Sequence, residues 1–271
     1  MSSQIDIAAI ASETLAALDS GRQIPPFSTR GAITLDDAYR ISAAMRGTRV
    51  GRGERVLGRK IGFTNRTIWA EYGVYAPIWG YVYDRTLRNL ADLGGAFSLA
   101  GLAEPRIEPE IVFGLARAPA PGMDDKALIG CVEWVAHGFE LVQSIFPGWK
   151  FTTADTVACN GLHGALLIGE RHPVGAQTDE WLRTLAAFEI DLMRNGAVMD
   201  RGRAGNVMEG PLSTLRYAMD LLANDRANPP LGAGEIVTTG TLTRALPVKP
   251  GETWSTALSG VALGGISVRF G

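Results

Sequence analysis

The stretch RIEPEIVF, residues 106–113, places two glutamates within a run that is otherwise mostly apolar. Its length and its β-branched residues predict a β-strand, in which residues i and i+2 point to the same face. Glu108 and Glu110 are therefore expected side by side on one face of a sheet. Pro109 lies between them and favours a strand at a sheet edge or at a bulge, because proline cannot donate a ladder hydrogen bond. The apolar neighbours in the strand are Ile107, Ile111 and Phe113.

Two carboxylates on a dry strand face repel each other, and one of them would stay protonated. A divalent cation removes this cost, since hard cations such as Mg²⁺ bind carboxylate oxygens and keep positions for water or substrate. A third carboxylate, Glu140, occurs in GFELVQ (138–143), which is a second apolar strand pattern. The spacing therefore offers a metal site formed by Glu108, Glu110 and Glu140. The same spacing also fits a second interpretation, in which Glu108 and Glu110 are ordinary glutamates on a solvent-exposed strand face.

The rest of the chain predicts an α+β fold. Its 33 glycines mostly separate short apolar runs, which indicates many turns between strands. Helical patterns come first and a strand-rich body follows, without the strict alternation of a doubly wound fold, so we expect a mixed, curved β-sheet roll with a smaller helical N-terminal region. A soft boundary within 75–95 divides the chain into an N-terminal α/β region, 1–85, and a β-rich catalytic core, 86–271.

Local patterns predict the individual elements. A T-x-x-D cap formed by Thr34 and Asp37 indicates where one helix begins, and Asn195-Gly196 between alternating apolar residues indicates a type I′ hairpin. Helices are expected over 6–19, 35–49, 65–73 and 211–225, and over about 12 residues at the start of 124–144. Strands or extended segments are expected over 56–63, 76–87, 106–116, the end of 124–144, 164–170, 189–202, 235–243 and 260–270.

Composition excludes several classes of protein. Apolar residues make up 46% and charged residues 20% of the chain, as in an ordinary globular protein. The net charge of −2 provides no basic field, so neither nucleic acid nor an anionic membrane is expected as a partner. The N-terminus has no signal-peptide pattern, and no uncharged apolar run reaches about 18 residues. Cys131 and Cys159 form no C-x-x-C pair, which is typical of a reducing, cytoplasmic setting. The strand-rich body and the six tryptophans allow a homo-oligomer.

Lys60 is a candidate site residue. It lies in GRKIGF (58–63), where Gly58 and Gly62 would let a ligand approach the backbone. Most lysines lie at the protein surface, so Lys60 could equally be an ordinary surface residue.

Three polar residues lie in segments that read as turns. Asp155 and Asn160 in ADTVACNG are turn-forming residues, and an ordinary loop explains them equally well. Thr241 ends TTGT (238–241), whose backbone N–H groups and hydroxyls suit a carboxylate, although a simple β-turn fits too. No histidine pairs with cysteine or another histidine at metal-ligand spacing, and His137 is expected to be structural or to lie beside the metal ligands.

Five sequence blocks together resemble the hydratase/decarboxylase branch of the fumarylacetoacetate hydrolase superfamily. This branch includes 2-keto-4-pentenoate hydratase and 4-oxalocrotonate decarboxylase, and the resemblance extends over about residues 30–270. The blocks are GRKIGFTN (58–65), EPRIEPEIVF (104–113), HGFELVQS (137–144), FTTADTVACN (151–160) and TTGTLTRALPVKPGE (238–252).

The resemblance implies roles for the candidate residues. It implies that Glu108, Glu110 and Glu140 are ligands of Mg²⁺ or Mn²⁺. It also implies that Lys60 donates a proton or fixes a substrate carboxylate, and that Asp155 orients Lys60 or handles a proton.

Two polar residues are implied to contact the substrate. Asn160 would hydrogen-bond the substrate or hold a metal-bound water, and Thr241 would contact a substrate carboxylate. The substrate implied is a 2-oxo acid that chelates the metal, which acts as a Lewis acid on the carbonyl. Charge that develops as a dienolate is stabilised where it appears. This arrangement serves both hydration of 2-hydroxydienoates and decarboxylation of 2-oxo-3-hexenedioate in the meta-cleavage degradation of aromatic compounds.

The choice between these two reactions depends on PIWG, residues 77–80. Hydratases of this branch often carry an acidic residue at the position of Ile78, and an apolar group beside the scissile carboxylate favours loss of CO₂. Trp79 is expected to line the same pocket. We therefore favour the decarboxylase, with the hydratase as the alternative. A C–C hydrolase of a diketo acid also stays open, although no His–Glu pair for activating water is evident. A non-catalytic subunit in complex with a related lyase is a further alternative.

Overall fold

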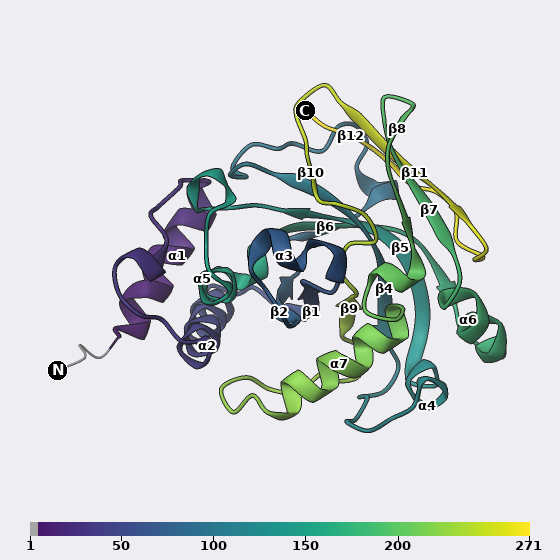
Figure 1. Ribbon diagram of the computed structural model, residues 1–271, viewed down its shortest axis with the longest axis horizontal. Helices are drawn as coiled ribbons and strands as arrows, with labels where there is room; N and C mark the ends of the chain where they lie inside the picture. Colours follow the sequence, from purple (N-terminus) through teal and green to yellow (C-terminus); the bar gives the residue numbers. More distant parts are fainter. Residues whose placement is uncertain (1–4) are drawn as a thin grey trace.

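The computed structural model describes residues 5–271 as two β-sheets with helices around them (Figure 1). The larger sheet has eight strands in the order β2-β1-β9-β4-β5-β6-β3, with β10 pairing to β4. Its strands are β1 (Val56–Gly62), β2 (Ile78–Tyr83), β3 (Leu87–Asn89), β4 (Arg106–Leu115), β5 (Val132–Val142), β6 (His163–Pro173), β9 (Ile236–Thr238) and β10 (Leu246–Pro247).

The smaller sheet has four strands in the order β12-β11-β7-β8 and stands at the upper right of Figure 1. Asn195 and Gly196 both have positive φ angles, of 51° and 82°, which confirms the predicted turn between β7 and β8. The strands are β7 (Glu189–Arg194), β8 (Ala197–Arg203), β11 (Thr253–Ser259) and β12 (Ser267–Arg269).

In Figure 1, α1, α2 and α5 lie at the left, α4 and α6 at the lower right, and α3 and α7 between these two groups. The predicted cap is present, since Thr34 and Asp37 form a reciprocal capping box at the start of α2. Among the described residues, no helix is both long enough and apolar enough to cross a membrane. The α-helices are α1 (Ile7–Ser20), α2 (Leu35–Gly51), α3 (Trp69–Tyr72), α4 (Asp125–Ile129), α5 (Thr153–Ala158), α6 (Thr178–Leu185) and α7 (Pro211–Ala223).

The sheet is mixed, as predicted. β1 pairs with β9 in parallel and β3 with β6 in parallel, whereas β1–β2, β4–β5, β4–β9 and β5–β6 are antiparallel pairs. Strands β1 and β2 come from residues before 86, so the larger sheet contains strands from both sides of the predicted boundary. The division into 1–85 and 86–271 stays a prediction.

The prediction of a helix of about 12 residues before Glu140 is wrong. The helix is α4, which has five residues, and the 11-residue strand β5 follows almost at once. β5 is an interior strand between β4 and β6, and its apolar side chains are buried in the hydrophobic clusters that pack on the faces of the sheet. This tertiary burial overrides the local helical preference.

Pro109 lies in an interior strand, neither at the expected sheet edge nor at the expected bulge, since the register of β4 with β5 shifts only at Gly114 and Leu115. On one side, β4 pairs continuously with β5. On the other side, β9 pairs with residues 112–114 and β10 with residues 106–107, so within residues 5–271 no strand pairs with Pro109 on this side. The carbonyl of Pro109 accepts a hydrogen bond from the backbone N–H of Leu242 at 3.0 Å. A proline is tolerated because the missing N–H would face this interruption.

Candidate metal centre

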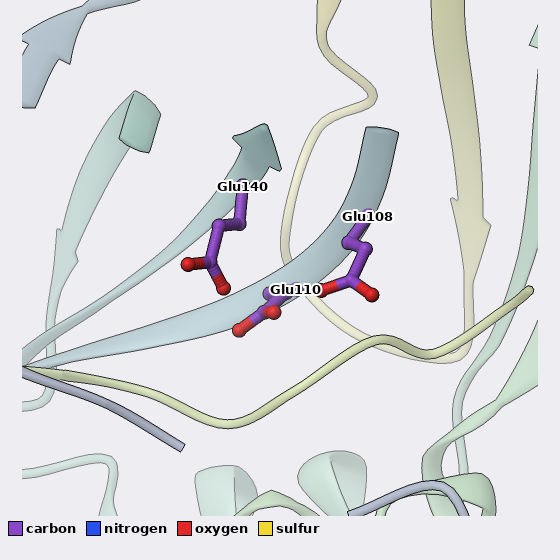
Figure 2. A group of neighbouring side chains, drawn as sticks. All are labelled: Glu108, Glu110 and Glu140. Atoms are coloured by element: carbon purple, nitrogen blue, oxygen red, sulfur yellow. The ribbon is translucent and has the colours of Figure 1, made fainter. Parts of the chain in front are cut away.

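The carboxylates of Glu108, Glu110 and Glu140 converge at the centre of the larger sheet (Figure 2). Glu108 pairs directly with Glu140 across β4 and β5, and Glu110 lies two residues along on the same face of β4. One oxygen from each carboxylate lies within 4.8 Å of the other two. Glu110 and Glu140 are fully buried and Glu108 is half-buried, so a solvated strand face is excluded.

Burial and neighbouring charges shift the pKa values of the three carboxyl groups in different directions. Burial raises the pKa of Glu110 well above its ordinary value, and the negative charges of Glu140 and Glu108 raise it further. Burial and then repulsion by Glu140 raise the pKa of Glu108 to about 7, against attraction by Lys60. Burial opposes ionisation of Glu140 too, but Lys60 and His163 outweigh it and lower the pKa of Glu140.

The cluster fits a hard divalent cation. Glu110 Oε2 accepts a hydrogen bond from the Gly240 N–H at 2.7 Å, whereas Glu110 Oε1 is buried with no hydrogen-bond partner within residues 5–271. A buried carboxylate oxygen without a partner is costly, and a cation bound by all three glutamates would satisfy it. These residues are therefore the ones that could hold Mg²⁺ or Mn²⁺.

Lys60 is a buried lysine rather than a surface one, with 2% of its area exposed. Its Nζ lies 3.2 Å from Glu140 Oε2 and donates to the carbonyl of Gly161 at 3.0 Å. Burial favours the neutral amine, but Glu140, Glu108 and Glu110 together raise the pKa of Lys60, so it stays protonated. The structure thus places one fixed positive charge beside the three carboxylates.

His163 also binds the cluster, and the sequence analysis missed it. His163 Nδ1 lies 2.7 Å from Glu140 Oε1, and Nε2 lies 2.8 Å from Thr86 Oγ1. The His–Glu pair that was not evident in the sequence is therefore His163 with Glu140. His137 contacts the backbone carbonyl of Glu110 and the hydroxyl of Thr256, both at 2.9 Å. Sequence spacing gave no signal for His163, because 23 residues and a helix separate it from Glu140.

Replacing His163 with alanine should weaken binding of Mn²⁺ about tenfold to a hundredfold, because the partner that fixes the Glu140 carboxylate is lost. Isothermal titration of the purified protein with Mn²⁺ measures this change. His163→Asn should keep most of the affinity, since its amide can still donate to Glu140. His172→Ala, on the same strand, is the matched control. Equal affinities in His163→Ala and in the unaltered protein would contradict the positioning role.

Metal affinity should rise with pH up to about 7, because Glu108 must lose its proton to bind a cation. Titrations with Mn²⁺ at several pH values test this. Stability of the metal-free protein should change in the opposite sense. The folded-state pKa of Glu108 lies above the ordinary value of 4.5, so the stabilisation is present at low pH and is lost as pH rises from 4.5 to about 7. A metal-free melting temperature that increases across this range would contradict the assignment.

A cavity of about 480 Å³ opens beside Glu108. Four of the predicted residues line it: Lys60, Ile78, Glu108 and Thr241. The Thr241 hydroxyl donates to the carbonyl of Thr243 at 2.9 Å, so this side chain also shapes the cavity wall. Arg106, Trp149 and Arg244 line the cavity as well, and the sequence analysis did not select them. The i, i+2 rule that joined Glu108 to Glu110 also places Arg106 on this face.

Five of the predicted site residues do not line the cavity: Glu110 and Glu140 of the carboxylate cluster, and Trp79, Asn160 and Asp155. Trp79 is buried and stacks on Tyr39, with ring centroids 5.1 Å apart. Asn160 hydrogen-bonds both the N–H and the carbonyl of Tyr81, at 2.7 and 2.9 Å. Asp155 accepts hydrogen bonds from Ser28, and from Thr152 within the capping box of α5 rather than in a loop.

Asn160 and Asp155 stabilise the backbone segment that carries the Gly161 carbonyl, the acceptor of the Lys60 hydrogen bond. α5 leads directly into a tight turn over Asn160–Leu162, whose three residues all have positive φ angles of 61–65°. This turn presents the Gly161 carbonyl to Lys60. The two hydrogen bonds of Asn160 to Tyr81 hold the turn against β2.

Comparisons with known proteins agree with this geometry. No family model matches the chain. A 2-hydroxyhexa-2,4-dienoate hydratase from Comamonas testosteroni is 33% identical over 94% of this chain and 93% of its own length. A 4-oxalocrotonate decarboxylase from Pseudomonas putida is 32% identical over 88% of this chain and 86% of its own. The chain belongs to the hydratase/decarboxylase branch of the fumarylacetoacetate hydrolase superfamily.

Membership of this branch confirms the predicted family and fold class. The structure of 4-oxalocrotonate decarboxylase from Pseudomonas putida G7, solved with magnesium and adipate, superposes with a TM-score of 0.87 at 26% identity. The match covers 97% of each chain, so it includes both the mixed sheet and the N-terminal helices. The sequence similarity to the hydratase and to the decarboxylase thus extends over most of the chain, 94% and 88% of it respectively.

Proposed function

We propose that this chain is a divalent-metal-dependent lyase that decarboxylates 2-oxo-3-hexenedioate, also named 4-oxalocrotonate. The observation that carries the proposal is the three-glutamate cluster, of which Glu108 lines a cavity that the buried Lys60 also lines. Glu108, Glu110 and Glu140 would hold Mg²⁺ or Mn²⁺. When bound, the metal supplies a Lewis acid for the 2-oxo acid group of the substrate.

Lys60 is the proposed proton donor. In decarboxylation, the C–C bond to the departing carboxylate breaks and CO₂ leaves. The electron pair moves through the conjugated chain to the 2-oxo oxygen, which takes up a proton to give a 2-hydroxydienoate. Lys60 lines the cavity, and the neighbouring carboxylates raise its pKa and keep it protonated, so it suits this transfer.

Asp155 and Asn160 would orient Lys60 indirectly. Asp155 caps α5, and Asn160 fixes the following turn, whose Gly161 carbonyl accepts the hydrogen bond from Lys60. Thr241 would shape the wall against which the substrate lies.

Ile78 supports decarboxylation over hydration. Ile78 is 2% exposed and lines the cavity. An aliphatic side chain can neither bind nor activate water, so hydration lacks a polar group at this position. The decarboxylase solved with magnesium and adipate, a dicarboxylate, is also similar to the whole chain.

A hydratase of 2-hydroxypenta-2,4-dienoate is the second candidate, since the Comamonas testosteroni relative is a dienoate hydratase. The hydrolase alternative has less support, because His163 does not line the cavity and its partner Glu140 belongs to the three-glutamate cluster that would hold the metal. We propose further that the enzyme is cytoplasmic and homo-oligomeric, and that it functions alone or with a related lyase.

A product assay tests the function. The purified chain is incubated with 2-oxo-3-hexenedioate and, separately, with 2-hydroxypenta-2,4-dienoate, with and without Mg²⁺. Mg²⁺-dependent release of CO₂ from the first compound supports the decarboxylase. Loss of dienoate absorbance from the second alone supports the hydratase. Activity that appears only after a related lyase is added would identify a partner subunit.

A further inference from the structure

The strands beside the cavity form two successive levels. At the inner level, Glu108 of β4 lies opposite Glu140 of β5. Two residues away along β4, roughly 6.6 Å, Arg106 lies opposite Val142 at the outer level. Trp149 lines the cavity at this outer level, since its indole packs on the Arg106 guanidinium with 4.0 Å between the guanidinium carbon and the ring centroid. A ligand chain that begins at Glu108 and runs along β4 therefore reaches Trp149.

Trp149 has an unusual backbone conformation. Its φ angle is 58°, in the left-handed region that bulky residues rarely adopt. Gly148, just before it, has a φ angle of 67°, so the chain turns tightly over Pro147–Trp149. A strained residue persists only where surrounding contacts impose its conformation, and such residues gather at functional sites. The contacts that impose this conformation therefore indicate whether the position of the indole matters.

Glu104 supplies these contacts. Its carbonyl accepts a hydrogen bond from Trp149 Nε1 at 3.1 Å, and its Oε1 accepts one from the Gly148 N–H at 3.0 Å. Gln23 Nε2 donates to the same Oε1 at 2.8 Å and to the Ser144 carbonyl at 3.2 Å. Glu104 also has a positive φ angle, of 44°. Two strained residues thus hold each other, and Gln23 from the N-terminal region supports the pair.

The indole of Trp149 is not simply part of the core. Trp79 and Trp254 are 1% and 0% exposed, as expected for core packing. Trp149 is only half-buried and lines the cavity, although its backbone and its Nε1 are fixed. Glu104 and Trp149 lie in the segments before β4 and after β5, so their strain serves no strand pairing. A rigid, partly exposed ring suits a wall against which a ligand ends.

We infer that Trp149 limits the length of the carbon chain that the cavity accepts, and that Glu104 is the positioning residue that holds this ring. The inference rests on the proposed function for the orientation of the ligand, whose 2-oxo acid group lies at the glutamates. Chains up to the six carbon atoms of 2-oxo-3-hexenedioate should fit between the glutamates and the indole. A longer chain must displace the ring together with the strained turn that carries it.

Binding of unbranched 2-oxo acids tests the wall. The Mg²⁺-loaded protein is titrated with 2-oxohexanoate and with 2-oxodecanoate, which share the 2-oxo acid group. In an unobstructed apolar cavity, each added CH₂ group raises the affinity by up to roughly fourfold. In the unaltered protein, 2-oxodecanoate should instead bind about tenfold more weakly, as expected for overpacking. Trp149→Ala should abolish or reverse this difference, and an unchanged difference would overturn the inference.

Variants of Glu104 test its positioning role. Glu104→Ala removes the acceptor of Gly148 and Gln23, so the ratio of the two affinities should fall about threefold to tenfold. Glu104→Gln keeps an acceptor oxygen at this place and should keep the ratio. Glu170→Ala, at an exposed glutamate outside the cavity, is the control. A residue with only a structural role would change both affinities by the same factor, so an unchanged ratio in Glu104→Ala would contradict positioning.

The indole N–H can be tested separately from the ring. Trp149→Phe keeps an aromatic ring but loses the donor to the Glu104 carbonyl, so it should relax the length limit in part. Trp134→Phe, on β5 outside the cavity, should leave the limit unchanged. If Trp149→Ala does not fold, Trp149→Leu gives the same comparison, since leucine is shorter than an indole and still apolar.

Turnover separates this inference from the proposed function. A length limit that disappears in Trp149→Ala, in a protein that converts neither 2-oxo-3-hexenedioate nor 2-hydroxypenta-2,4-dienoate, would support the wall and contradict the proposed function. Turnover of 2-oxo-3-hexenedioate by a protein that binds 2-oxohexanoate and 2-oxodecanoate equally would support the function and overturn the wall. Absence of binding by both acids would overturn the wall and the proposed orientation together.

Discussion

Replacing Glu108 with glutamine should reduce turnover by about three orders of magnitude, because one of three charged ligands is lost. Glu108 is the cluster member that lines the cavity, and its carboxylate lies directly opposite that of Glu140. Binding of Mn²⁺, measured by titration, should weaken in parallel. The metal-free variant should nevertheless melt at a higher temperature, since burial and repulsion by Glu140 both disfavour the ionised Glu108.

This opposite effect on activity and stability distinguishes a ligand from a structural residue. A substitution that only damages the fold lowers both the activity and the melting temperature. Glu133→Gln is the matched control, because Glu133 is an exposed glutamate on the same strand as Glu140. Normal turnover by Glu108→Gln would rule out the three-glutamate metal site.

Replacing Lys60 with methionine should reduce kcat by about a hundredfold to ten-thousandfold, as expected for loss of a proton donor. Methionine fills much of the same volume and removes the charge that lies 3.2 Å from Glu140. Without metal, the variant should lose about 3–5 kcal/mol of stability, because breaking a buried ion pair leaves one charge unpaired. Affinity for Mn²⁺ should not decrease, since Lys60 competes with a cation for the same carboxylates.

Retained metal binding with lost turnover is the decisive pattern for Lys60. Lys126→Met, an exposed lysine on α4, is the control for the substitution itself. If Lys60→Met lost the metal and the activity together, Lys60 would be needed to assemble the site rather than to transfer a proton.

The sequence alone predicted the parts of the site that strand periodicity controls. The i, i+2 spacing of Glu108 and Glu110 requires no tertiary information, and the capping and hairpin signals depend on a few neighbouring residues. Placing Glu140 in the cluster required tertiary information, because only the register of β4 with β5 shows that Glu140 lies opposite Glu108 and not one residue away. A register shift of one residue would have turned it to the other face of the sheet.

The contacts that the sequence could not provide are those between distant segments. His163 meets Glu140 because β6 runs beside β5 with the observed register. Arg244 reaches the cavity because a short segment crosses the interruption beside Pro109. Trp79 was expected in the pocket, but side chains alternate along β2 and only its neighbour Ile78 lines the cavity.

Pro109 gives this sheet a property that an uninterrupted strand would not have. With an ordinary residue at this position, the segment 239–245 could pair with β4 along its whole length and lie flat against it. The carbonyls of Thr241 and Thr243, which a continuous ladder would pair with β4, instead face the side-chain amide of Asn65 at 3.5 and 3.4 Å. Because Pro109 offers no backbone donor, β4 holds this segment here only through its carbonyl, and Thr241, Arg244 and Ala245 line the cavity beside Glu108. Pro109 affects the surroundings of the glutamates through its missing backbone N–H and not through a reactive side chain.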